Sequence, residues 1–296
     1  MPTGIEWCDE TWNPMIGCSG CEVLHCWAKM YAWRHAQNPT MGKNQAKYAR
    51  LVTDRCGRCG GEGRYLRNLE ALSAFTMRKE TARVFCLDCH GTGKGPLRWT
   101  GKIEYFPERL EDPLRWRKPR RVFVCGMGDP FAEGVDPAYI WDVYKAMSRA
   151  PWHTFIILTK RHARMAELVP RIRGTLPDRL EHVIHGTSIS DQRTADLRVP
   201  EILKVQGRHC LSLEPMLEEI KMRPGWLSHA QGIEEIYLGG QTGPGAPPLH
   251  PQWVRDVRDQ CAEAKVRFWF KRWSWPAGKP DPGRTLDGRT HDGEVG

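Results

Sequence analysis

The chain has 296 residues, of which 40% are hydrophobic and 27% charged, as in an ordinary globular protein with a sizeable core. It contains no apolar run of the roughly 18 residues that a membrane helix needs and no secretory pattern, so we expect no membrane association and a cytoplasmic location. The net charge of +9 favours a polyanionic partner such as DNA, and eleven cysteines in such a protein indicate metal or redox chemistry rather than disulfides.

Three cysteines lie close together in the first predicted strand–helix unit. A strand is expected to end within 13–17, and a helix follows at 27–36. Cys18, Cys21 and Cys26 occupy the loop between them. A structural zinc site usually takes four protein ligands. Three thiols therefore indicate a metal with an open position, a redox pair with a third cysteine, or buried thiols.

A C-x-x-C-x-G-x-G pattern occurs twice, at 56–63 and 86–93, and resembles the zinc-binding repeats of DnaJ-type chaperones. Two such knuckles form a four-thiolate zinc site, and their glycines allow backbone N–H groups to approach the sulfurs. We expect one structural Zn²⁺ here, with two unrelated redox pairs as the alternative. The predicted zinc ligands are Cys56, Cys59, Cys86 and Cys89.

The segment between the two knuckles, 64–85, is polar and basic and is expected to form a helix or a hairpin arm. It is a candidate nucleic-acid contact, with a solvated basic face as the alternative reading. The basic residues of this region are Arg55, Arg58, Arg64, Arg67, Arg78, Lys79 and Arg83.

From residue 120 onward, short apolar runs alternate with helical patterns, which indicates βα units on a parallel sheet. Asp136 and Pro137 mark the start of one helix. The predicted strands are 121–126, 154–159, 182–188, 209–215, 234–240 and 266–273, and the predicted helices are 136–150, 160–172, 192–205 and 250–265. Six or seven such units favour a full or partial barrel, with an open doubly wound sheet as the alternative.

The chain is therefore expected to contain four regions. They are a first βα unit with the thiol loop at 1–53, a zinc-binding insertion at 54–98, the remaining βα units at 99–275, and a flexible tail rich in Gly and Pro at 276–296.

Polar or glycine-rich residues follow nearly every predicted strand, where active sites of βα barrels lie. Asp129 and Lys160 stand there, although a helix cap and a solvated helix start are alternatives. Glu214 directly follows a buried strand, which favours a functional role. The glycines of 239–245 would let the backbone approach a ligand closely.

Four further cysteines are scattered along the chain. Cys125, Cys210 and Cys261 are expected to be small buried hydrophobes. Cys8 is a reserve ligand for the nearby thiol loop.

Several segments, taken together, resemble a family of phage and bacterial three-Cys-motif proteins that is itself similar to radical S-adenosylmethionine (SAM) enzymes. The likeness runs in order from about residue 5 to 275 and leaves out the zinc insertion. Its segments are TWNPMIGC…CWA, GMGDPF, APWHTFIILTKR, LEPML, GGQTGPGAPPLHPQWVRDVRDQC and FWFKRW. The family spacing is C-x6-C-x2-C or C-x3-C-x2-C, whereas this chain has C-x2-C-x4-C followed by Trp27.

The resemblance implies that the three thiols hold a [4Fe–4S] cluster, with SAM on the fourth iron and electrons from an external donor. A zinc site completed by Cys8 or His25 is the alternative. The implied fold is a partial (βα)6 TIM-like barrel of the radical SAM type with a small inserted zinc-binding subdomain. The residues expected to bind SAM or substrate are Gly126, Gly128, Asp129, Ser188, Glu214, Gly239 and Gly240.

The implied function is a radical SAM enzyme that modifies or rearranges a base of phage DNA, best described as an isomerase or mutase acting on hypermodified thymidine. Thirteen tryptophans, some of which would stack on bases, and the net charge agree with a nucleic-acid substrate. A radical SAM repair enzyme and a non-catalytic, zinc-dependent nucleic-acid-binding protein are the alternatives. If a phage encodes the chain, its location is the host cytoplasm.

Overall fold

The structure is a computed structural model. It describes residues 5–20, 27–37, 43–55, 62, 64–69, 80–85, 94–176, 180–228, 232–243 and 245–294. The chain forms two compact units, one made of residues 1–16 and 104–296 and the other of residues 17–103. Each unit is described by itself below.

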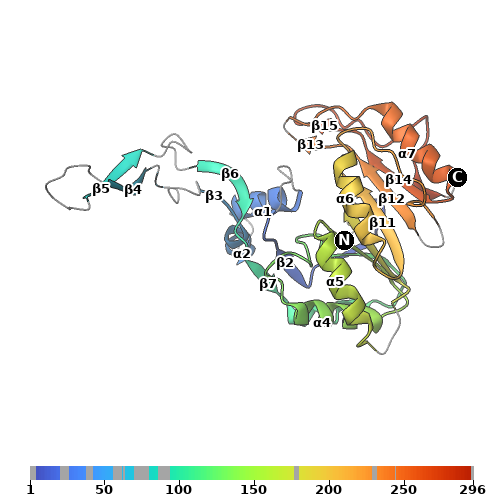
Figure 1. The fold of residues 1–296 in the computed structure, drawn as a ribbon, viewed down its shortest axis with the longest axis horizontal. Helices are drawn as coiled ribbons and strands as arrows, with labels where there is room; N and C mark the ends of the chain where they lie inside the picture. The colour runs from blue at the N-terminus through green and yellow to red at the C-terminus, as the bar shows by residue number, and fades with distance from the viewer. Residues whose placement is uncertain are drawn as a thin grey trace. The chain divides into compact units, whose positions relative to one another are not determined.

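Among the described residues, the larger unit contains one curled sheet of eight strands that forms a half-barrel (Figure 1). The strands, in spatial order, are β1 (Glu10–Trp12), β8 (Arg121–Val124), β9 (Thr154–Thr159), β10 (Val183–Ser188), β11 (Arg208–Leu213), β12 (Ile233–Gly239), β14 (Arg267–Arg272) and β16 (Asp292–Glu294). All neighbours are parallel except β14 and β16. The predicted α/β class with a mainly parallel sheet is therefore confirmed.

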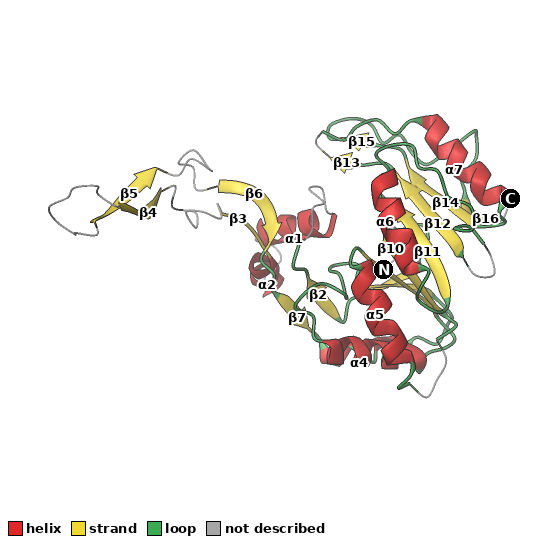
Figure 2. Ribbon diagram, viewed as in Figure 1, coloured by secondary structure: helices red, strands yellow, loops and turns green. Residues whose placement is uncertain are grey.

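Four helices lie against one face of this sheet (Figure 2). They are α4 (Pro137–Ser148), α5 (His162–Arg173), α6 (Gln192–Ile202) and α7 (Pro251–Glu263), with the short η2 (Pro107–Arg109) and α3 (Asp112–Arg115) ahead of β8. The predicted cap of α4 is present, because the Asp136 side chain accepts the Ala138 N–H at 2.9 Å. Within the described ranges, no helix is long and apolar enough to cross a bilayer.

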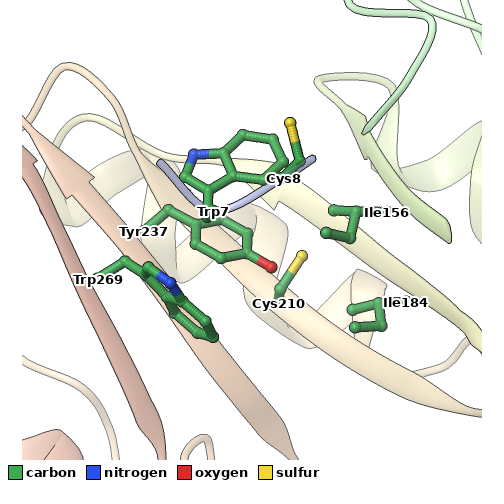
Figure 3. Close-up of a cluster of buried hydrophobic side chains, with 7 residues drawn as sticks. All are labelled: Trp7, Cys8, Ile156, Ile184, Cys210, Tyr237 and Trp269. Carbon is green, nitrogen blue, oxygen red and sulfur yellow. The ribbon is translucent and has the colours of Figure 1, made fainter. Parts of the chain in front are cut away.

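The inner face of the sheet carries an apolar cluster that includes Ile156, Ile184, Cys210, Tyr237 and Trp269 (Figure 3). The N-terminal segment adds Trp7 and Cys8 to it. The Trp7 ring stacks on Tyr237 with centroids 4.4 Å apart. Because side chains alternate between the two faces of a strand, this cluster identifies which strand positions face inward.

The first strand of the sheet differs from the prediction. Residues 13–17 were expected to end that strand, but β1 ends at Trp12, and Met15–Gly17 forms β2, which pairs with β7 (Ile103–Tyr105) instead. Pro14 has no N–H to continue the ladder. Asn13 turns its side chain to the loop after β8, where its Oδ1 accepts the Met127 N–H at 3.0 Å.

The C-terminal residues also differ from the expected flexible tail. β15 (Trp275–Pro276) pairs with β13 (Thr242–Gly243), and β16 pairs along the edge of β14. Leu286 is 1% exposed. Asp287 forms ion pairs with Arg255 and Arg258 of α7. The Gly and Pro content therefore marks turns of an ordered segment that covers a strand edge.

Among its described residues, the smaller unit contains α1 (Trp27–Gln37), α2 (Lys43–Leu51) and two antiparallel strand pairs. β3 (Val52–Arg55) pairs with β6 (Lys94–Trp99), and β4 (Arg64–Leu69) pairs with β5 (Glu80–Phe85). The arm expected as a helix or a hairpin is therefore a hairpin. Several predicted residues lie outside the described ones, namely Cys21, Cys26, Cys56, Cys59, Cys86, Cys89, His25, Arg58, Arg78 and Lys79.

Candidate functional site

The carboxyl ends of the parallel strands form one edge of the larger unit, as the sequence predicted. Alternation from the inner cluster places five residues of this edge on the inner face of the sheet. They are Lys160 after β9, Ser188 on β10, Glu214 after β11, Gly239 on β12 and Lys271 on β14. Three of them, Ser188, Glu214 and Gly239, were predicted site residues.

Glu214 and Lys271 form an ion pair at this edge. The Lys271 Nζ lies 2.7 Å from Glu214 Oε2, and the Trp7 Nε1–H donates to Glu214 Oε1 at 3.3 Å. The two charged side chains are 18% and 26% exposed, so the pair is only partly screened by water. Lys271 was not among the predicted site residues, although a cation directly after the apolar residues 268–270 of β14 is a signal for it.

Gly239 lies beside both side chains of the ion pair. A Cβ at this position would stand 3.4 Å from the Lys271 Cβ and 3.6 Å from the Glu214 Cγ, which are ordinary van der Waals distances. The space beside the pair would therefore accept an alanine side chain at this position.

A second carboxylate, that of Glu6, also interacts electrostatically with Lys271. Burial lowers the pKa of Lys271, but Glu214 and then Glu6 raise it by more, so that it lies above its ordinary value. One carboxylate oxygen of Glu6, Oε2, is buried and receives no hydrogen bond from the described residues. The edge thus holds the Lys271 ammonium ion and the carboxylates of Glu214 and Glu6, and Oε2 of Glu6 can still accept a hydrogen bond.

Asp129 makes three internal hydrogen bonds. Its carboxylate accepts from the Thr159 hydroxyl at 2.6 Å, the Phe131 N–H at 2.9 Å and the Lys160 N–H at 3.0 Å. These bonds tie the loop after β8 to the carboxyl end of β9. Asp129 therefore holds the edge together and sets the position of the Lys160 backbone.

Two of the other predicted glycines, Gly126 and Gly240, lie in tightly packed backbone. A Cβ at Gly126 would stand 3.0 Å from the Phe123 ring, and the Gly128 N–H donates to the Cys125 carbonyl at 3.0 Å. At Gly240 a Cβ would stand 2.3 Å from the Ser274 backbone nitrogen. Gly240 is therefore required by the approach of the segment that leads into β15.

Ser188 and Lys160 occupy the β9–β10 side of the edge. Ser188 is 8% exposed, and its carbonyl accepts a hydrogen bond from Arg198 at 2.5 Å. Lys160 is half-buried. Among the described residues, no carboxylate lies within ion-pair distance of its ammonium group. This side differs from the β11–β14 side, where the lysine charge is matched.

Cys18 is the one member of the predicted cluster triplet within the described residues. Its side chain is buried, at 8% exposed, and its Sγ accepts the Gly20 N–H at 3.4 Å. Gly20 has a φ of +92°, a conformation that favours glycine. No group of three His, Cys, Asp or Glu side chains suited to a metal occurs in the described ranges, from which the other six predicted thiolate ligands are missing.

Cys125, Cys210 and Cys261 are buried, as expected, and Cys8, the reserve ligand, is buried as well. Cys8 packs in the inner cluster beside Trp7. Burial raises the pKa of Cys125, Cys210 and Cys261. These three thiols therefore remain protonated and behave as small apolar side chains.

Neither the curated proteins nor the solved structures contain a match to this chain. One sequence family, described as a protein of unknown function (DUF5131), matches residues 2–294. Because that match covers nearly all of the 296 residues, the chain belongs to the DUF5131 family.

Proposed function

We propose that this chain is an iron–sulfur enzyme of the radical SAM type, whose curled sheet serves as a partial (βα)6 barrel. The observation that carries the proposal is the environment of Cys18, whose buried sulfur accepts a backbone N–H from Gly20. Such N–H···S bonds orient metal-bound thiolates and tune the potential of a cluster. Cys18, Cys21 and Cys26 would supply three ligands to a [4Fe–4S] cluster and leave one iron for SAM.

The cluster and SAM, when bound, would supply a 5′-deoxyadenosyl radical that abstracts hydrogen from the substrate. The protein's own part is to orient the substrate and exclude water. Glu214 and Lys271 offer a carboxylate and an ammonium ion on the inner face, where a ligand's polar groups can be oriented. The apolar cluster around Trp7 and Tyr237 lies deeper on the same face and keeps that region dry.

The proposed substrate is a base of DNA, and the proposed reaction is the modification or rearrangement of hypermodified thymidine by an isomerase or mutase. The net charge of +9 and the β4–β5 hairpin between the zinc knuckles support a nucleic-acid partner. Chemistry on a base requires a single strand or a flipped nucleotide. We place the reaction in the cytoplasm, with an external electron donor.

Anaerobic reconstitution followed by metal analysis and a SAM-cleavage assay tests the proposal. The wild-type protein is expected to be brown, to contain iron and zinc, and to form 5′-deoxyadenosine under reduction. Cys26→Ala should keep zinc but lose both the cluster absorbance and 5′-deoxyadenosine formation. Cys8→Ala is the matched control and should keep both, because Cys8 packs in the apolar cluster.

The zinc site has its own test. Cys86→Ser should lose zinc and destabilise the insertion while iron stays bound. If iron falls together with zinc in this variant, the division into two metal sites is wrong. A colourless wild-type protein with zinc in place of iron would instead favour a non-catalytic, zinc-dependent nucleic-acid-binding protein. Activity on damaged rather than hypermodified DNA would favour a repair enzyme.

A further inference from the structure

We infer that the β9–β10 side of the carboxyl edge binds a backbone phosphate of the nucleic-acid substrate, through the Lys160 ammonium and the Ser188 hydroxyl. This inference deepens the proposed function and rests on it for the class of substrate. According to this inference, Lys160 binds the substrate, and Ser188 contacts the substrate rather than SAM.

The sheet places the two residues at neighbouring backbone positions. Thr159 of β9 pairs with Thr187 of β10, so Lys160 and Ser188 follow at neighbouring positions on strands about 4.8 Å apart. Asp129 fixes the backbone of Lys160 by accepting its N–H at 3.0 Å. An ammonium ion beside a hydroxyl is a donor set suited to the oxygens of a phosphate.

The charge of Lys160 is not matched by the acids nearby in the fold. Asp129, in the loop after β8, is occupied by three internal hydrogen bonds. Asp191, which follows β10, caps α6 by accepting the Thr194 N–H at 2.6 Å. Because both carboxylates are engaged by neighbouring groups, the Lys160 ammonium keeps its capacity to bind an anion.

The opposite side of the edge does not offer this capacity. The Lys271 ammonium is already bound to Glu214 at 2.7 Å. Four strand steps separate β9 from β14, on the order of 19 Å along the sheet. The edge therefore has one anion-binding side, at Lys160, and one side on which the lysine charge is already paired.

The experiment measures binding of a short fluorescein-labelled oligothymidylate by anisotropy over a series of salt concentrations, without reductant, so that no turnover contributes. Lys160→Ala should weaken binding roughly three- to tenfold at low salt and make the salt slope shallower by about 0.7, the value for one lost phosphate contact on a single strand. Lys160→Arg should keep the wild-type slope, because the charge remains. Ser188→Ala should weaken binding without changing the slope.

Lys118→Ala is the matched control, since Lys118 is exposed and precedes β8 at the opposite, amino edge. It removes the same charge and should leave the slope unchanged. Equal slopes for Lys160→Ala and wild type would overturn the inference while leaving the proposed function intact.

SAM affinity, measured by equilibrium dialysis on the same reconstituted proteins, separates the two sources of an anionic group. Lys160→Ala should bind SAM like wild type. A variant that loses SAM binding but keeps oligonucleotide binding would show that the lysine holds the SAM carboxylate, and would overturn the inference. Wild-type protein that binds no oligonucleotide would overturn both the inference and the nucleic-acid substrate, whereas absence of iron would overturn only the radical SAM proposal.

Discussion

The charged side chains around Glu235, at the amino edge of the parallel sheet, are fully paired, whereas those at the carboxyl edge are only partly paired. At the amino edge Glu235 is fully buried and surrounded by three arginines. Its carboxylate lies 2.6 Å from Arg121, 3.3 Å from Arg267 and 3.6 Å from Arg208, and it accepts the Tyr237 hydroxyl at 2.5 Å. Both oxygens of this carboxylate have partners within the protein, so the Glu235 charge is matched by the fold itself.

At the carboxyl edge the network is incomplete. The Glu214–Lys271 pair is partly exposed, one oxygen of Glu6 has no donor, and the Lys160 ammonium has no carboxylate within reach among the described residues. Buried polar groups are normally satisfied in a folded protein. The completed network therefore stabilises the fold, whereas we propose that a ligand supplies the missing partners of the incomplete one.

The largest expected effect is that of Glu235→Gln. Removing this charge leaves three arginines without their shared partner, which should lower the free energy of unfolding by about 3–5 kcal/mol. Urea unfolding monitored by tryptophan fluorescence measures it. A loss of less than about 1 kcal/mol would contradict the assignment of this network to stability.

The same residue predicts a pH dependence. Burial raises the pKa of Glu235, but Arg121, Tyr237 and Arg208 lower it by more, so that it lies below its ordinary value. A depressed carboxyl pKa contributes stability above the unfolded value of about 4.3 and loses it as the pH falls through the folded value. The wild-type protein should therefore lose stability below about pH 4.3 in a step that Glu235→Gln lacks.

Glu214→Gln makes the same chemical change at the carboxyl edge that Glu235→Gln makes at the amino edge. Because the Glu214–Lys271 pair is partly exposed, the free energy of unfolding should fall by about 1 kcal/mol or less. The formation of 5′-deoxyadenosine should fall at least about tenfold if this carboxylate orients a ligand, a loss of about 1.4 kcal/mol in transition-state stabilisation. Equal destabilisation by the two Glu→Gln changes would remove the distinction between the edges.

The two neighbouring glycines at the carboxyl edge should differ from each other in their effect on stability. Gly240→Ala forces a Cβ against the Ser274 backbone and should lower the free energy of unfolding by about 1–3 kcal/mol. Gly239→Ala makes only ordinary contacts, so the change should stay within about 0.5 kcal/mol. Thermal unfolding of the two variants side by side measures the difference, and the reverse order would mean that the packing at Ser274 is incorrectly described.

The smallest expected effect is that of Lys271→Met on the alkaline side. Because Glu214 and Glu6 raise the pKa of Lys271, its contribution to stability is present below the unfolded value of about 10.4 and is lost as the pH rises through the folded value. The contribution should be about 1 kcal/mol or less. Melting temperatures near about pH 8 and about pH 11 should differ more for wild type than for Lys271→Met, and identical shifts would show that the pair adds no stability.

Much of the larger unit follows from local sequence pattern. The strand at 154–159 was predicted to the residue, and the helix after Asp136 begins where its cap and Pro137 indicate. Apolar periodicity and capping act over a few residues, so they can be read without knowing the rest of the fold. The first strand and the C-terminal segment were placed wrongly because both depend on partners distant in the chain.

The candidate site also has some features that the sequence predicts and others that depend on the fold. That Glu214 ends a buried strand is visible in the order of residues, as is the proximity of Cys18 to Cys21 and Cys26. Nothing in the local sequence shows that Lys271 reaches Glu214, because 57 residues separate them. Among the described residues, Lys271 is paired with a carboxylate and Lys160 is not, because the fold brings Glu214 close to Lys271.

The amino-acid sequence by itself determined the βα order, the helix start at Asp136, and the positions at which polar residues follow strands. These features arise from periodicity, caps and turns, which involve neighbours along the chain. Only the tertiary structure decided that Asp129 is consumed by internal hydrogen bonds, that Gly240 is held by packing, and that the two sheet edges differ in charge pairing. The physical reason is that hydrogen bonds and ion pairs between strands depend on register and sheet curvature, which no single segment of the chain contains.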